Sequence, residues 1–172
     1  MNTTHLHLLL NHFPIIGTMI GSGLLLWGIL KNQNNIKTIA SVILVVMALI
    51  AIPVFLTGEP AEDAVEKLPG VSESIIELHE DAAVLATWLM GITGLAALVA
   101  LLFQWQKKPL SKALFLTTCM LSAICFAAMA RTGYYGGQIR HTEIRTGAAV
   151  NLQNEREQDK TGQDNKNEEY TD

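Results

Sequence analysis

The chain contains five histidines, and all of them lie close to the ends of long apolar segments. Three precede the first apolar segment, one precedes the third and one follows the fourth: His5, His7, His12, His79 and His141, in that order. Imidazole is a common metal ligand and a common axial ligand of haem iron. An imidazole inside hydrocarbon is costly. Histidines collected at the ends of apolar segments therefore predict a metal or haem site at a membrane surface.

Four segments are long enough, or nearly so, to cross a bilayer core, which requires about 20 apolar residues in a helix. They comprise residues 13–30, 39–57, 82–105 and 113–130, and none contains an acidic or basic side chain. A soluble bundle would show polar faces at helical period, and these segments do not. We therefore predict an all-α fold, a four-helix transmembrane bundle within one domain of residues 1–149, whose last helix extends beyond the membrane.

The connections between these segments differ in charge. The two short connections, 31–38 and 106–112, carry five lysines and no carboxylate, whereas the long connection 58–81 carries eight carboxylates and one lysine. The positive-inside rule places the lysine-bearing connections in the cytoplasm. Both termini and all five histidines are then expected on the outer, periplasmic side of a bacterial inner membrane.

The end of the chain has a different composition from the rest. Residues 150–172 are polar and acidic and carry almost no apolar side chains, so they are predicted to form a disordered tail. No nucleophile–base constellation or phosphate-binding loop appears, which argues against an independent enzyme. The expected partners are the lipid bilayer and other membrane proteins, and no nucleic acid.

Residue spacing favours two of the histidines as a ligand pair. Small residues follow His79 on its helical face, which leaves space beneath the imidazole. Gly133, Gly137 and His141 follow one another at intervals of four, and a glycine face lets a flat macrocycle approach the backbone. We predict b-type haem with His79 and His141 as axial ligands and with His12 as the competitor for either position.

Further residues are candidates for binding haem, and two alternatives to haem are open. His7 is the second candidate ligand in the N-terminal segment, and the guanidinium groups of Arg131 and Arg140 are candidates to pair with haem propionates. Copper or zinc bound by His79, His141 and His12 is an alternative, since neutral imidazole suits both metals. A third alternative is an accessory subunit that binds no cofactor.

The two cysteines lie in the fourth apolar segment. Cys119 and Cys125 are six residues apart and point to different helix faces. No paired-cysteine motif suggests a thiolate metal site, so they are interpreted as small apolar packing residues.

With these residues in view, the segment HLLLNHFPIIGT resembles a widespread family of small four-helix bacterial inner-membrane proteins of unknown function. Members typically open with His-Pro and His-Phe-Pro, carry Thr-Gly after the second span and a histidine before the third, and end near Gly-Gly followed by histidine. The matching residues are His7, His12-Phe13-Pro14, Thr57-Gly58, His79, Gly136-Gly137 and His141. Leu8 replaces the first proline, and the ending GGQIRHTEIR differs from the usual one.

This resemblance covers about residues 5 to 145 and implies the four-helix fold and four of the histidines. It implies no firm activity, although membrane redox proteins are a plausible setting. Taken together, the sequence predicts a membrane electron-transfer subunit that binds b-type haem near the outer face and docks on redox partners, such as those of a respiratory complex.

Overall fold

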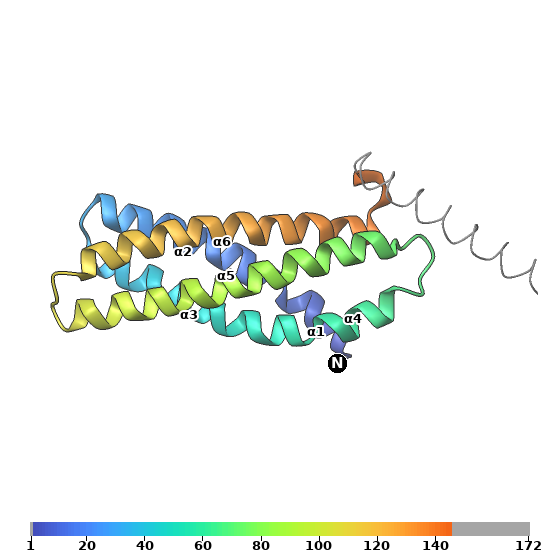
Figure 1. Ribbon diagram of the computed structural model, residues 1–172, viewed down its shortest axis with the longest axis horizontal. Coiled ribbons are helices and arrows are strands. Elements are labelled where there is room, and N and C mark those ends of the chain that lie inside the picture. The colour runs from blue at the N-terminus through green and yellow to red at the C-terminus, as the bar shows by residue number, and fades with distance from the viewer. Residues whose placement is uncertain (1, 146–172) are drawn as a thin grey trace, which may run out of the picture.

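The computed structural model describes residues 2–145 and is built of helices (Figure 1). The helices are α1 Thr3–Leu10, α2 His12–Leu30, α3 Asn34–Leu56, α4 Gly58–Val65, α5 Glu73–Trp105 and α6 Ser111–Arg140, followed by the 3₁₀ turn η1 Thr142–Ile144. The predicted disordered tail, residues 150–172, lies outside the described residues.

Four helical stretches are long and apolar enough to cross a membrane, one in each of the segments 3–30, 34–56, 73–105 and 111–140. The prediction of an all-α fold with four membrane-spanning helices is confirmed. At 1.5 Å per residue, the 19 residues of α2 and the 23 of α3 extend over about 29 and about 35 Å. These lengths match a hydrocarbon core of about 30 Å.

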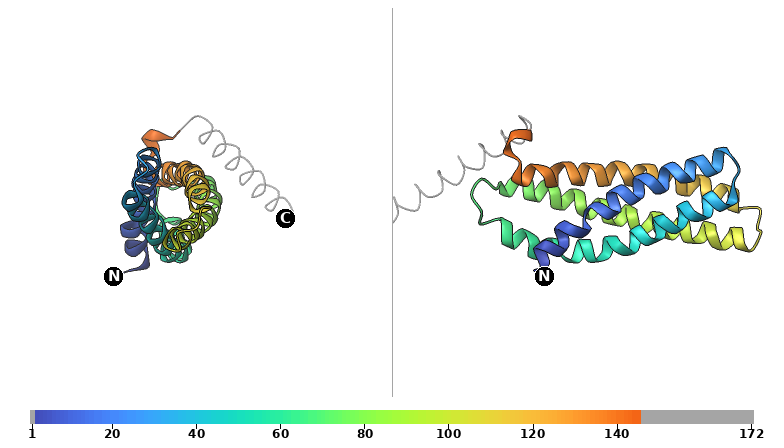
Figure 2. Two further views of the ribbon diagram at one scale, coloured as in Figure 1. Left: turned by 90° about the vertical axis from the view of Figure 1, so that its left-hand side faces the viewer. Right: turned by 180° about the vertical axis from the view of Figure 1, so that it is seen from behind.

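α5 and α6 are too long for the hydrocarbon core alone. Their 33 and 30 residues extend over about 50 and about 45 Å. The excess lies at one end of the bundle, beside α1 and α4 (Figures 1 and 2). We call this end the polar cap: α1, α4, η1, the part of α5 before Ala82 and the part of α6 after Ala130. The two lysine-bearing connections lie at the opposite end of the bundle (Figure 1).

Small residues let the spanning helices approach one another closely. A Cβ at Gly21 would lie 2.9 Å from Cδ2 of Leu44, and a Cβ at Gly94 would overlap Cβ of Ala48. Such contacts are typical of membrane bundles. Lipid tails are as apolar as the side chains, so helices associate through close van der Waals packing and not through the hydrophobic effect. The core cluster at the lysine end consists of Leu25, Ala40, Leu44, Ala97, Ala100 and Phe115.

The outer surface of the spanning helices is strongly apolar. Trp88 is 71% exposed, Met120 is 65% exposed and Leu49 is 61% exposed. A water-soluble protein rarely exposes so many large apolar side chains in a continuous belt. In a bilayer the same side chains contact lipid tails, so the surface agrees with the membrane-spanning assignment.

Candidate functional site

His7 is held inside the polar cap by main-chain and side-chain oxygens. Its helix, α1, packs chiefly on α4 and also contacts α3 and α2. His7 Nδ1 lies 3.0 Å from the carbonyl oxygen of Val54 and 3.3 Å from Oγ1 of Thr57. A carbonyl oxygen can only accept a hydrogen bond, so Nδ1 carries the ring proton and donates it. The lone pair of this half-buried imidazole is therefore on Nε2.

His79 is held in the same manner from the other side of the cap. Its Nδ1 lies 3.0 Å from the carbonyl oxygen of Thr132, so here too Nδ1–H donates and Nε2 carries the lone pair. A Cβ at Gly136 would lie 3.1 Å from Cε1 and 3.2 Å from Nδ1 of this ring. The imidazole from α5 therefore rests on the backbone of α6 at a position that only glycine fits without displacement.

The two anchored imidazoles act on each other electrostatically. His79 lies three residues before the apolar part of α5 begins at Ala82, so it is outside the membrane-spanning segment. Burial lowers the pKa of His79, and the charge on a protonated His7 lowers it further, against the opposing effects of the Thr132 carbonyl and of Glu80. Burial likewise lowers the pKa of His7. Both groups are thereby kept neutral, which is the state in which imidazole binds a metal.

The other predicted ligands lie at the surface. His12 is exposed at the first residue of α2. His141 caps the C-terminal end of α6, where its side chain is 64% exposed and its Nδ1 lies 2.8 Å from Oε1 of Glu143. The structure therefore holds His7 and His79 in the cap, where they interact electrostatically, and leaves His12 and His141 in contact with solvent.

The arginines proposed for propionate binding lie on the C-terminal part of α6. The guanidinium of Arg131 lies 5.5 Å from the ring centroid of Tyr135, and the side chain of Arg140 is exposed. A third arginine, Arg145, has a structural role instead. It donates to the carbonyl oxygens of Gly70, Gln138 and Ile139 at 2.7, 3.0 and 3.2 Å.

The glycine that contacts His79 is neither of the two that the four-residue spacing selected. A Cβ at Gly133 would meet Cδ1 of Ile15 at 3.1 Å, and one at Gly137 would meet Cδ1 of Ile144 at 3.5 Å. The glycine that faces His79 is Gly136, which the four-residue spacing passes over. Gly58 has the corresponding place near His7, where a Cβ would lie 3.8 Å from Cε1. The Thr57-Gly58 pair after the second span is the sequence signal that could have predicted the contact between Gly58 and His7.

The number of clustered ligands limits what the cap can hold. Among residues 2–145, no three histidine, cysteine or carboxylate side chains are arranged as a metal-ion site. The cap therefore offers two imidazoles. In each ring Nδ1–H donates a hydrogen bond to a carbonyl oxygen, so Nε2 is the nitrogen that can bind a metal.

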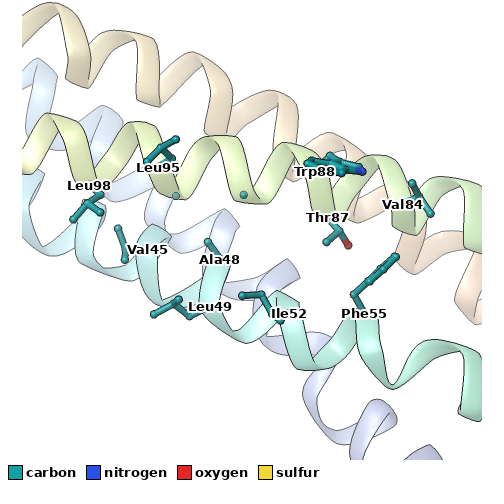
Figure 3. Close-up of a pocket in the computed structure, with 12 residues that line it drawn as sticks. Val45, Ala48, Leu49, Ile52, Phe55, Val84, Thr87, Trp88, Leu95 and Leu98 are labelled. Atoms are coloured by element: carbon teal, nitrogen blue, oxygen red, sulfur yellow. The ribbon is translucent and has the colours of Figure 1, made fainter.

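A groove between α3 and α5 is a separate feature (Figure 3). It has a volume of ≈ 530 Å³ and runs from Val45 and Leu98 at one end to Phe55 and Val84 at the other. Thr87 and Trp88 supply the polar side-chain atoms of its lining. Its walls are continuous with the apolar outer surface, so it suits lipid tails and has no chemistry of its own.

Comparison with known proteins adds no assignment. No protein-family model, no curated protein and no solved structure matches this chain. The family resemblance suggested by the short motifs remains a prediction.

Proposed function

We propose that this protein is a membrane electron-transfer subunit that binds b-type haem in the polar cap, where Nε2 of His7 and Nε2 of His79 would hold the iron. One observation carries the proposal: both imidazoles donate Nδ1–H to a main-chain carbonyl oxygen, at 3.0 Å in each case. Metal-binding histidines almost always donate their other ring nitrogen in this way, because the bond fixes the tautomer and the ring orientation.

The number of ligands supports haem over a bare metal ion. A porphyrin supplies four nitrogens, so haem iron requires at most two axial ligands from the protein. A structural zinc site usually takes four protein ligands, and a catalytic one takes three. The cap contains two anchored imidazoles, from α1 and α5, and His79 rests on the Gly136 backbone. When bound, haem would supply one-electron transfer.

The protein anchors the two imidazole rings, removes them from solvent and supplies positively charged side chains for the haem propionates. The carbonyl oxygens of Val54 and Thr132 hold the two rings, and burial keeps both rings neutral. Arg131 adjoins Thr132 in the chain and is the preferred group for pairing with a propionate, with Arg140 as the alternative. We place the site on the periplasmic side of a bacterial inner membrane, where it would exchange electrons with a docked redox partner.

The test is the visible spectrum of the full-length protein purified in mild detergent, before and after dithionite. The proposal requires a Soret band, with sharp α and β bands after reduction. His7→Ala and His79→Ala, made singly, should each abolish the low-spin spectrum or the bound haem, because each removes one axial ligand.

Matched controls come from the exposed histidines. His5→Ala and His12→Ala remove an imidazole from the same N-terminal region and should leave the spectrum unchanged. Loss of the low-spin spectrum in His141→Ala, with retention in His7→Ala, would overturn the assigned ligand pair. A colourless protein that carries stoichiometric copper or zinc would overturn the haem proposal and favour a metal-handling function.

A further inference from the structure

A second group of ligand-type side chains lies inside the bundle, below the polar cap. Met90 of α5 and Cys125 of α6 are both fully buried, and their sulfur atoms are 3.7 Å apart. Met129 belongs to the same buried cluster, and Met47 packs against it. Thiolate and thioether sulfurs are the soft ligands that bind Cu(I). The histidine site makes no use of any of these four side chains.

The separation of the two sulfurs fits a shared metal. With metal–sulfur bonds of about 2.3 Å and a tetrahedral angle between them, two ligand sulfurs lie about 3.8 Å apart. In the structure the Cys125 thiol donates a hydrogen bond to Met90 Sδ across this gap. A monovalent metal can replace that proton while the two side chains keep their rotamers.

The Met90 sulfur keeps a lone pair for such a bond. Thr18 Oγ1 lies 3.3 Å from Met90 Sδ, but it lies 2.5 Å from the carbonyl oxygen of Pro14. A hydroxyl has one proton, and the carbonyl is the nearer and stronger acceptor. The Thr18 hydroxyl therefore contacts the thioether of Met90 but leaves the sulfur lone pairs available for a metal.

A second polar group beside the Cys125 thiol has no hydrogen-bond partner among the described residues. The Thr93 hydroxyl is fully buried and lies close to the Cys125 thiol. Within the described part of the chain its oxygen makes no hydrogen bond of ordinary geometry. A buried donor of this kind costs free energy unless it gains an acceptor. A thiolate at Cys125 would be that acceptor.

We propose that Met90 and Cys125 form a Cu(I) site inside the membrane, with Met129 as the third sulfur ligand and Thr93 as a donor to the thiolate. On binding, the Cys125 S–H bond breaks and an S–Cu bond forms. The proton leaves to solvent and no electron is transferred. Cu⁺ and the thiolate together are neutral, which avoids a net charge in hydrocarbon, whereas a divalent ion would leave one.

The proposed copper site lies below the cap along α6. Thr132, Met129 and Cys125 lie on one side of α6, at successive intervals of three and four residues. Thr132 holds His79 through its carbonyl oxygen, and Cys125 is seven residues, or about 10 Å, deeper. Along the helix axis, Met129 therefore lies between the residue that holds His79 and Cys125.

The experiment is an anaerobic Cu(I) titration of the full-length protein in detergent, in competition with a chromophoric Cu(I) chelator. We expect one tight site per chain. Cys125→Ser should abolish this site, and Met90→Leu should weaken it at least about tenfold, since even loss of an outer-shell partner costs that much. Cys119→Ser and Met120→Leu are matched controls on the same helix and should bind as the wild type does.

Two further measurements make the test independent of folding defects and of the histidine site. X-ray absorption of the copper-loaded wild-type protein must show sulfur in the first coordination shell. His79→Ala must keep the tight Cu(I) site, whatever happens to the haem spectrum. A first shell of nitrogen and oxygen alone, or equal loss of the site in Cys119→Ser and Cys125→Ser, would overturn the proposal.

Discussion

Gly136 and His79 lie so close together that a Cβ at position 136 would be 3.1 Å from Cε1 of the imidazole and 3.2 Å from Nδ1. The same ring nitrogen donates to the carbonyl oxygen of Thr132, one turn earlier in α6. The hydrogen bond to Thr132 and the contact with residue 136 together restrict the position of the ring. The orientation of Nε2 of His79 therefore depends on residue 136 being a glycine.

The first prediction follows from this contact. Gly136→Ala should displace the His79 ring by a few tenths of an ångström and lower the haem content or shift the low-spin spectrum, while the helices remain folded. The measurement is the ratio of Soret to protein absorbance in purified protein. Gly91→Ala is the matched control, because a Cβ there meets nothing within 4 Å. Equal haem content in both variants would contradict the role given to Gly136.

The second prediction concerns pH. The pKa of His79 is lowered from its ordinary value of 6.5, chiefly by burial. Below pH 6.5 the unfolded chain therefore binds a proton that the folded protein does not, and stability falls as pH falls. In protein purified without haem, the unfolding temperature should decrease between about pH 7.5 and about 5.5, and His79→Gln should show a smaller decrease.

The carboxyl group of Glu62, which is only partly buried, affects stability in the opposite direction, and its effect has to be separated from that of His79. Burial and the neighbouring carboxylates Glu80, Glu66, Asp63 and Glu59 raise the pKa of Glu62 above 4.5. Its contribution to stability is therefore lost as pH rises from 4.5, so acidification favours the folded state there. Glu62 is present in both proteins, so the difference between wild type and His79→Gln isolates the imidazole. His12→Gln, at an exposed position, should follow the wild-type curve.

The fold could be predicted from the sequence because its cause is local. Each apolar segment is continuous and free of charge, and the bilayer selects a helix for any such segment. The order of the apolar segments along the chain also predicted that the histidines lie at one end of the bundle. Figure 1 shows α1, α4 and the end of α6 in the half of the molecule opposite the lysine-bearing connections.

The site could not be predicted to the same extent, because it depends on contacts between distant segments. The sequence favoured His12 over His7, since His12 is nearer to the first span. In the structure α1 folds against α4, and this brings His7 to Val54 and Thr57, about fifty residues away in the chain. No spacing within the segment 5–18 contains that information. The sulfur pair of Met90 and Cys125 is hidden for the same reason.

The third prediction concerns the C-terminal end of the cap. Arg145 ties the connection before α5 to the end of α6 through the carbonyl oxygens of Gly70 and Gln138. Hydrogen bonds from a charged donor contribute about 1.5–3 kcal/mol each, and Arg145 is only partly buried, so Arg145→Gln should cost about 1–3 kcal/mol in total. Thermal unfolding in detergent measures this loss. Arg140→Gln removes an exposed arginine from the same region and should change the unfolding temperature little.

The last prediction is the orientation of the bundle in the membrane, on which the proposed periplasmic site depends. The lysines of the two short connections lie at the end of the bundle opposite the polar cap, and positive residues are retained in the cytoplasm. A cysteine introduced at exposed Glu59 should therefore react with a membrane-impermeant maleimide on intact cells. A cysteine introduced at exposed Lys107 should react only after the membrane is opened. Cys119 and Cys125 provide the background, measured in the unmodified chain. Labelling of Lys107→Cys but not Glu59→Cys on intact cells would invert the bundle and place the histidine pair in the cytoplasm, where its redox partner would have to be sought instead.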